Sequence, residues 1–511
     1  MTNSTPTDQE LAARIAKTGD KARISQATKR HAKGYNTARE NLDTLCSDSY
    51  FSEYGQLAVA AQRQRREYEE LQSETAADGV ITGIASINIK HIDVANTKLS
   101  SANPYSTVLI VNDYSVLAGT QGYFHHLKID RMLHIASKKH LPVIMFTEGG
   151  GGRPGDTDIS TVNSGLQCAT FGHWASLTGK VPRIAVNNGY CFAGNAALFG
   201  VADITIATES SSIGMAGPAM IEGGGLGKFA PAEIGPINVQ AKNGVVDIVA
   251  DNENHAINLA KVCLGYFQGY AINWEAPKHD ALSNVLPQDR RFVYDMYKVI
   301  NGIVDKESFT ELCAQYGGAI IQGFARIEGK PIGLIANNCK VLGGAIDVDA
   351  AHKLNRFMRL CNQFKIPLVS LTDTPGFMVG PEHEKGGAVR HLSELFTTGA
   401  NLSVDFIAVV IRKCYGLGAQ AMLSGSTSNP SYMVSWPQGE FGPMGLEGAI
   451  KLGFKKELAG EKDAKKRQAL FDTLLAQQYA KGKALEVATM LEIDAVINPC
   501  DTRKTIANAL S

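Results

Sequence analysis

Two glycine-rich turns are the segments of this chain whose residue types could do chemistry. One runs from Gly189 to Leu198 (GYCFAGNAAL) and the other from Tyr415 to Met422 (YGLGAQAM), and an apolar, strand-like run precedes each. A turn of small residues between a strand and a helix aims backbone N–H groups and a helix N-terminus at one point. Such a point can stabilise a developing oxyanion, for example the enolate of a thioester. The same residues also suit a tight turn with no ligand, so the turns alone leave both interpretations open.

The turns belong to a module that occurs twice, about 225 positions apart. In each half a proline is followed six positions later by an acidic residue, and Ile-Ala-Val leads to a cysteine seven positions after the isoleucine. From the proline to the closing glycine is 52 positions in one half and 51 in the other. The landmarks are Pro142, Glu148, Ile184, Cys191 and Gly194, matched by Pro367, Asp373, Ile407, Cys414 and Gly418. This repeated order predicts one active site built from two related half-sites.

Two other glycine clusters do not form phosphate-binding P-loops. Residues 148–155 lack the Lys-Ser/Thr pair of that motif, and in the second cluster Lys228 is followed by phenylalanine. Residues 217–227 suit a mobile wall beside a bulky ligand instead. Arg153 and Lys228 could contact phosphates of such a ligand, or could lie in solvent.

Side-chain acids and bases are scarce around the turns. Glu222 and Asp373 are candidates, but a lone carboxylate beside glycines is more often a cap or a turn anchor. The 12 histidines show neither a Ser-His-Asp order nor metal-ligand spacing, so we predict no metal site. Backbone donors without a side-chain base suit a reaction whose cofactor brings its own base.

The elements that position the turns repeat as well. Strands are predicted at 80–87, 106–111 and 142–146 with a helix near 123–140, and again at 320–327, 332–336 and 368–371 with a helix at 349–364. Two strands and then a helix form a ββα unit. Residues 1 to about 78 are charged and predict a helical extension, with a surface helix over 57–71. The Pro- and charge-rich segment 276–291 predicts a linker, and hence domains 1–280 and 281–511.

The composition excludes several classes of function. Lys plus Arg equals Asp plus Glu, at 50 each, so no global field recruits nucleic acid or an anionic membrane. No apolar run approaches the roughly 18 residues that span a bilayer, and the polar start lacks a signal-peptide core. The nine scattered cysteines contain no Cys-x-x-Cys pair, which disfavours a disulfide scaffold or a zinc ribbon. We expect a cytoplasmic protein.

From about residue 35 to 510 the chain resembles the carboxyltransferase β subunits of biotin-dependent acyl-CoA carboxylases. Each matching segment is short, but their order across two domains is specific. The segments are Ala38–Leu42, Phe51–Gly55, Ala77–Gly83, Gly189–Gly194, Gly217-Pro218, Tyr294–Met296, Gly323–Arg326, Asp373–Phe377, Tyr415–Gly418 and Met444-Gly445.

The resemblance implies an α/β fold of two homologous crotonase-like domains made of repeated ββα units. The first domain would bind acyl-CoA and the second biotin, in a site at an interface between subunits. By position, the N–H groups of Ala193 and Gly194 would hold the thioester enolate, and those of Leu417 and Gly418 the ureido oxygen of biotin. The implied substrate-binding residues are Gly189, Asn195, Gly217, Gly223, Gly224 and Lys228. The implied biotin-binding residues are Phe377, Met378, Val379, Tyr415, Gly416 and Gln420.

The resemblance also implies a mechanism and partners. Carboxybiotin would release CO2, biotin N1′ would take the acyl α-proton, and the enolate would attack the CO2, which accounts for the missing base. The chain has no Met-Lys-Met biotinylation motif and no ATP-grasp pattern. Biotin would therefore arrive on a separate carrier, served by a separate biotin carboxylase subunit. A homo-oligomer, commonly a hexamer, is expected, with no nucleic acid or membrane partner.

The acyl group and the direction of the reaction stay open. Asn195 and Gln420 stand where the propionyl-CoA type has other residues and look closer to the methylcrotonyl- and geranyl-CoA type. The loops at 148–158 and 217–227 resemble those of long-chain acyl-CoA carboxylases instead. A decarboxylase or transcarboxylase component would use the same two oxyanion turns. A third hypothesis is a non-catalytic relative that binds CoA.

Overall fold

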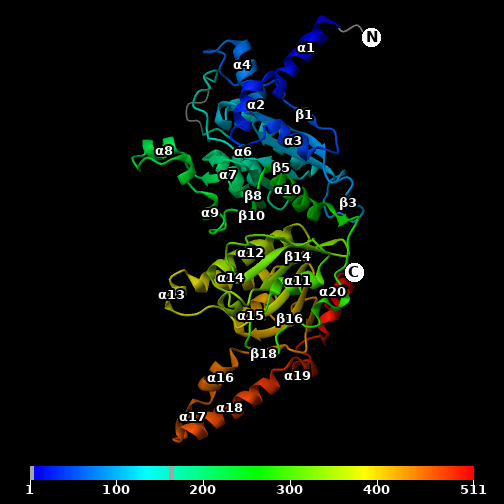
Figure 1. Cartoon of the computed structure of the whole chain (residues 1–511), viewed down its shortest axis with the longest axis vertical. Helices are drawn as coiled ribbons and strands as arrows, with labels where there is room; N and C mark the ends of the chain where they lie inside the picture. Colours follow the sequence, from blue (N-terminus) through cyan, green and yellow to red (C-terminus); the bar gives the residue numbers. More distant parts are fainter. Residues whose placement is uncertain (1–4, 160–165, 511) are drawn as a thin grey trace. The chain divides into compact units, whose positions relative to one another are not determined.

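The chain divides into two compact units, Met1–Tyr270 and Ala271–Ser511. The structure is a computed structural model that describes residues 5–159 and 166–510 (Figure 1). The division lies ten residues before the boundary proposed from the sequence at 280/281. Within the described residues, no helix combines the length and apolarity needed to cross a membrane.

The first unit is built on a seven-stranded sheet. Its strand order is β1 (Ser52–Tyr54), β2 (Val80–Ser86), β4 (Ser106–Asn112), β5 (Val143–Phe146), β6 (Arg183–Asn187), β8 (Ile204–Thr208) and β10 (Ile248–Ala250). The pairs β1–β2 and β2–β4 are antiparallel, and every later pair is parallel. A small parallel pair, β7 (Tyr190–Phe192) with β9 (Ser212–Gly214), lies outside this sheet.

The second unit repeats this topology. Its order is β12 (Thr310–Glu311), β13 (Ile320–Ile327), β14 (Lys330–Asn337), β15 (Leu368–Thr374), β16 (Phe406–Tyr415), β17 (Tyr432–Ser435) and β19 (Ala495–Val496), and β18 (Glu440–Gly442) also pairs with β16. Again the first two pairs are antiparallel and the rest parallel. The predicted strands and their repeated order are confirmed.

Each unit surrounds its sheet with helices. The first contains α1 (Pro6–Ala16), α2 (Ile24–His31), α3 (Ala38–Leu45), α4 (Tyr68–Glu74), α5 (Tyr123–Lys139), α6 (Thr170–Ala175), α7 (Gly194–Val201), α8 (Pro218–Gly223), α9 (Ile237–Gln240) and α10 (Glu253–Gln268). The second contains α11 (Met296–Ile303), α12 (Val348–Gln363), α13 (Pro381–Glu384), α14 (Ala388–Ala400), α15 (Gly416–Met422), α16 (Leu446–Gly453), α17 (Lys455–Gly460), α18 (Ala464–Lys481), α19 (Ala484–Thr489) and α20 (Thr502–Ala509). Helices α16 to α18 extend away from the sheet of the second unit (Figure 1).

Buried lysines mark equivalent places in the two units. Lys128 on α5 donates to the carbonyl oxygens of Ala77, at 2.7 Å, and of Val80. Lys353, 225 positions later on α12, donates to the carbonyl oxygen of Ile320 at 2.7 Å. An ammonium group is costly to bury unless it finds acceptors, so each lysine ties its helix to the start of a strand. The duplication therefore extends from the sequence to buried contacts.

One predicted helix is wrong. The segment 57–71 is helical only from Tyr68, the first residue of α4. Before it, the Ala60 N–H donates to the Thr75 hydroxyl at 3.0 Å, and the N–H groups of Arg63 and Gln64 donate to the Asp158 carboxylate. These N–H groups are bound by side chains distant in the sequence, so the local helical pattern is overridden.

Candidate active-site turns

The first glycine-rich turn leads from β7 into α7. Ala193 has φ 51° and ψ −119°, and its N–H donates to the Gly214 carbonyl at 3.0 Å. In the described part of the chain, the N–H groups of Gly194 and Asn195 have no hydrogen-bond partner. The structure thus offers Gly194 and Asn195 as donors, and not Ala193 as the sequence suggested.

The second turn has the same form where β16 runs into α15. Gly416 has φ 60°, a positive value like the 51° of Ala193. The N–H groups of Leu417 and Gly418 also lack partners among the described residues. Two neighbouring N–H groups are therefore available at each turn, as an oxyanion site requires.

Strand register aligns the two turns residue by residue. Cys191 pairs with Gly149, and Cys414 pairs with Thr374, which lies 225 positions after Gly149. With the cysteines equivalent, Gly194 corresponds to Leu417 rather than to Gly418. The glycine-to-glycine match drawn from the sequence was therefore off by one residue.

Gly418 has a packing reason to be glycine. A Cβ there would lie 2.7 Å from both the Gly376 Cα and the Phe377 N, and closer still to the Gly376 carbonyl carbon. Carbon atoms never approach a real Cβ so closely. The close approach places the Asp373–Phe377 segment directly against the second turn.

Asn195, predicted to bind substrate, has its side chain turned to the protein. Its Oδ1 accepts from the Gly151 N–H at 3.0 Å, and its Nδ2 donates to the Gly119 carbonyl at 3.5 Å. The side chain is fully buried. It therefore ties the first turn to two neighbouring loops, and only its backbone N–H remains for a ligand.

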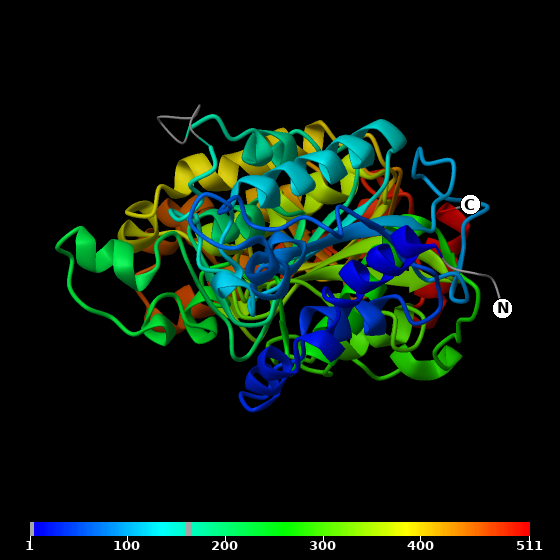
Figure 2. The same ribbon diagram turned by 90° about the horizontal axis from the view of Figure 1, so that it is seen from above.

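The other residues assigned to the substrate lie in two different settings. Gly189 is buried against the Glu148 carboxylate, and Gly217 lies beside the Phe192 ring at the start of α8. Gly223 and Gly224 end α8, where exposed residues continue to Lys228. The Lys228 side chain is 81% exposed and pairs with Glu222 at 2.7 Å. In both views α8 projects from its sheet (Figures 1 and 2).

Of the residues assigned to biotin, Phe377 lies against the second turn, because its backbone N is close to Gly418. The Met378 N–H donates to the Ile346 carbonyl at 2.9 Å, and the Phe377 ring lies edge-on to Phe396, with centroids 6.3 Å apart. Val379 is 77% exposed and Leu417 60% exposed. Gln420 is exposed as well. The turn thus presents apolar side chains beside its free N–H groups.

The Tyr415 side chain, at the start of the second turn, is held in place. Its hydroxyl donates to Glu440 Oε2 at 2.7 Å. Burial, and then the hydrogen bond to Glu440, raise the pKa of Tyr415 well above its ordinary value. The phenol therefore stays protonated and acts as a hydrogen-bond donor.

Two equivalent carboxylates behind the turns are anchors. Glu148 forms a two-pronged ion pair with Arg30, at 2.8 and 2.9 Å, and Asp373 pairs with Arg412 at 3.1 Å. Asp373 also accepts from the Lys413 N–H at 3.0 Å. Burial raises the pKa of Glu148 despite the opposing charge of Arg30. Both carboxylates are buried, so the anchor interpretation of Asp373 is favoured over a catalytic one.

Arg153 is not available to a phosphate. Its guanidinium is buried, pairs with Asp78 and Asp156, and donates to the Thr120 carbonyl at 2.7 Å. The arginine links the loop after β5 to the start of β2. Sequence reasoning could not see this, because Asp78 lies 75 positions away.

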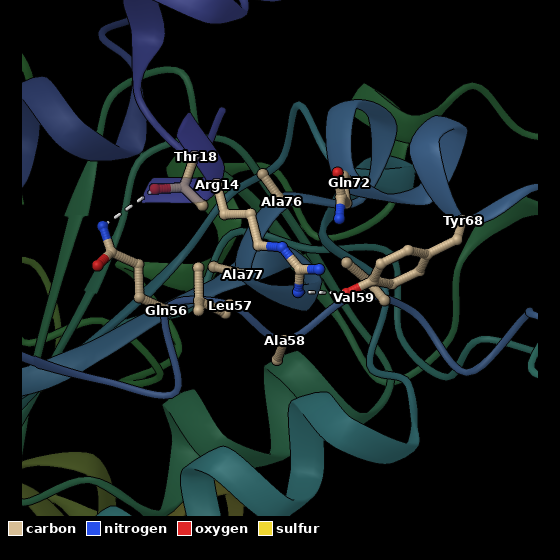
Figure 3. Close-up of a pocket in the computed structure, with 10 residues that line it drawn as sticks. All are labelled: Arg14, Thr18, Gln56, Leu57, Ala58, Val59, Tyr68, Gln72, Ala76 and Ala77. Carbon is tan, nitrogen blue, oxygen red and sulfur yellow. Dashed lines mark hydrogen bonds between the residues drawn. The ribbon is translucent and has the colours of Figure 1, made fainter. Parts of the chain in front are cut away.

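A separate, shallow pocket opens in the first unit (Figure 3). Its lining residues are Arg14, Thr18, Gln56, Leu57, Ala58, Val59, Tyr68, Gln72, Ala76 and Ala77. The Arg14 guanidinium donates to the Tyr68 hydroxyl at 3.5 Å, and the Gln56 amide to the Thr18 hydroxyl at 3.0 Å. None of these residues belongs to the two turns.

The carboxyl transferase domain family matches residues 29–511. The chain belongs to this family. The α subunit of methylmalonyl-CoA decarboxylase from Veillonella parvula is 30% identical over 515 residues, covering 98% of this chain and 94% of the relative.

Two solved structures share the fold over the whole chain. One, a single-chain, multi-domain long-chain acyl-CoA carboxylase, is 47% identical with a TM-score of 0.92. This chain spans about half of that protein, 49% of its length. The other is the transcarboxylase 12S crystal structure, described as a hexamer with methylmalonyl-CoA bound; it is 27% identical over 96% of its length, with a TM-score of 0.84. The crotonase-like carboxyltransferase fold implied by the resemblance is confirmed.

Proposed function

We propose that this chain is the carboxyltransferase component of a biotin-dependent acyl-CoA carboxylase. The observation that carries the proposal is the pair of equivalent turns, each with two free backbone N–H groups. Family membership supports it, because the homologous carboxyl transferases act on acyl-CoA thioesters.

In the first unit, the N–H groups of Gly194 and Asn195 would hold the thioester oxygen. Negative charge grows on that oxygen when the α-proton leaves, and preorganised donors stabilise it. The buried Asn195 side chain keeps both donors in place through Gly151 and Gly119. The turn thus lowers the barrier to enolate formation without a side-chain base.

In the second unit, the N–H groups of Leu417 and Gly418 would donate hydrogen bonds to the ureido oxygen of biotin. The fit rests on those two donors and on the exposed apolar side chains of Leu417 and Val379 beside them. Bound biotin would supply the carboxyl group and the base. Residues of this chain orient the ring: Tyr415 is locked by Glu440, and Gly418 brings the Phe377 backbone close.

For the acyl group we propose a long apolar chain. The support is the 47% identity to a long-chain acyl-CoA carboxylase. Exposed apolar side chains around α8 (Met215, Met220, Leu226 and Phe229) could cover such a chain. A panel from acetyl-CoA to palmitoyl-CoA should give the highest kcat/KM at the long end, and a maximum at acetyl- or propionyl-CoA would contradict this assignment.

The decisive assay supplies a carboxylated biotin carrier and the acyl-CoA panel to the purified chain. We expect a carboxylated thioester, detected by mass spectrometry. Folded protein that forms no product from any acyl-CoA, yet binds CoA tightly, would favour a non-catalytic CoA-binding role instead.

A decarboxylase component is the second candidate. It is favoured by the 30% identity, over nearly full length, to the Veillonella parvula decarboxylase subunit. The reverse assay, with methylmalonyl-CoA and free biotin, distinguishes the two. Faster turnover in this direction than in the forward one would support the decarboxylase.

We also propose a homo-oligomer, as in the hexameric transcarboxylase 12S structure. Light scattering at micromolar concentration tests this directly. A monomer with full turnover would refute it.

A further inference from the structure

Gln121 distinguishes the first turn from the second. Its side chain is only 4% exposed, and its Nε2 has no hydrogen-bond partner among the described residues. The residue 225 positions later is Ile346, which occupies the same place in the second unit: Gln121 pairs with Gly152 and Ile346 with Phe377. The first half-site therefore has an amide side chain at the position where the second half-site has an aliphatic one.

The backbone holds Gln121 firmly in this place. Its N–H donates to the Gly151 carbonyl at 2.7 Å, and its carbonyl accepts from the Arg153 N–H at 2.9 Å. Arg153 is in turn fixed by its ion pair with Asp78. These contacts fix the backbone of Gln121 beside the loop that contains Gly151 and Arg153.

The amide lies against the N-terminal residue of α7. A Cβ built on Gly194 would collide with Gln121 Oε1 and would lie 3.1 Å from the Phe171 ring. The terminal amide torsion has a broad energy profile, so a half-turn exchanges its two ends. Either orientation keeps one end of the amide beside Gly194.

A buried amide nitrogen without a partner is uncommon, because its desolvation is not compensated. Burying such a group does not stabilise the fold. A ligand that accepts its hydrogen bond would give the group a role. The ligand must bring an acceptor to the start of α7, where the Gly194 and Asn195 N–H groups have no partner among the described residues. The thioester oxygen of an acyl-CoA meets this requirement.

We propose that the Gln121 side-chain amide donates a hydrogen bond to the thioester oxygen, as a third donor beside the N–H groups of Gly194 and Asn195. This inference rests on the proposed function of the first turn. It makes the two half-sites chemically different, with three donors for the thioester and two at the second turn. The third donor strengthens as charge develops on the oxygen, so its contribution falls mainly on kcat.

The test observes the thioester carbonyl itself. The full-length protein is loaded with palmitoyl-CoA carrying ¹³C at the carbonyl, without biotin, and the infrared band of the bound carbonyl is recorded. Hydrogen-bond donors move this band to lower wavenumber. In Gln121→Met, which keeps the length of the side chain but removes the donor, we expect part of this shift to be lost.

Kinetics provide the second readout. Gln121→Met should lower kcat about 10²-fold, the lower end of the effect of one oxyanion donor, with a much smaller change in KM. The matched control is Gln322→Met, because Gln322 is also buried and its Oε1 has no hydrogen-bond partner in the part of the chain that the structure describes, but it lies within β13. The control should leave the band and kcat as in wild type.

The outcomes separate the two proposals. Wild-type protein that does not bind palmitoyl-CoA, or any shorter acyl-CoA in its place, overturns the function proposed for the first turn. A wild-type band shift that Gln121→Met fully retains overturns the role of Gln121 alone. A loss of kcat with an unchanged band does so too, since it would show only a structural role.

Discussion

Replacing Gly418 by alanine should damage the fold, while the same change at Gly194 should damage only the site. At Gly418 the new methyl would meet the backbone of Gly376 and Phe377 at 2.7 Å, whereas real Cβ contacts stay beyond 3.0 Å. Backbone must then move by at least 0.3 Å from these two atoms and further from the Gly376 carbonyl carbon. At Gly194 the collision is with the end of the Gln121 side chain, which can turn away.

The magnitude follows from two opposing effects. Overpacking costs about 1–3 kcal/mol, and the better helix propensity of alanine returns up to about 1 kcal/mol. A net loss of about 1–2 kcal/mol is expected for Gly418→Ala. For a unit of this size each kcal/mol shifts Tm by about 2–4 °C, so the transition of the second unit should fall by roughly 2–8 °C.

The assay is differential scanning calorimetry beside carboxyl transfer. We expect Gly194→Ala to keep Tm within about 2 °C of wild type and to lose about 10²-fold in kcat, since the methyl displaces the Gln121 amide. A Gly418→Ala variant with wild-type Tm would show that the contact with Gly376 is easily relieved. Gly418→Ala would then obstruct only the site, as Gly194→Ala is expected to do.

Three further predictions concern charged residues. Asp373→Asn leaves the buried Arg412 without its counter-charge and should cost about 3 kcal/mol, seen as a lower urea midpoint; an unchanged midpoint would refute the anchor role. Burial lowers the pKa of Lys128 to about 8, so the unfolded chain holds more protons between pH 8 and 10.5 and stability should rise with pH across that window. Lys128→Met should remove this rise, and equal slopes in urea titrations of both proteins would contradict it. Glu222→Gln should keep activity within about 2-fold, because the side chain is exposed and pairs with Lys228 at the surface; abolished turnover with intact CoA binding would place the proton transfer on this carboxylate.

Much of the fold is readable from the sequence because its signals are local. Strands such as Ile320–Ile327 are β-branched runs, and the helices α5 and α12 carry their own apolar faces. The segment 57–71 shows the limit of this reasoning. Its helical pattern is real, but Thr75 and Asp158 bind its N–H groups, and neither contact is visible in a local window.

Some features of the candidate site can likewise be predicted from the sequence, and others cannot. Small residues at both turns are a sequence signal, and in the structure a strand leads into a helix at each of them. The Gln121 amide escaped notice because nothing in its neighbourhood distinguishes it from a surface glutamine. A comparison with Ile346 at the same offset of 225 was the one signal that could have found it.

The sequence by itself determined the duplication, the order of strands and the positions of the two turns, because spacing and residue type are properties of the chain alone. Only the tertiary structure decided which N–H groups are free. Ala193 donates to Gly214, Asn195 holds two loops with its side chain, and Arg153 is buried against Asp78. Each of these depends on a partner that folding brings from elsewhere in the chain. A hydrogen-bond donor can act on a substrate only where such partners leave it unpaired.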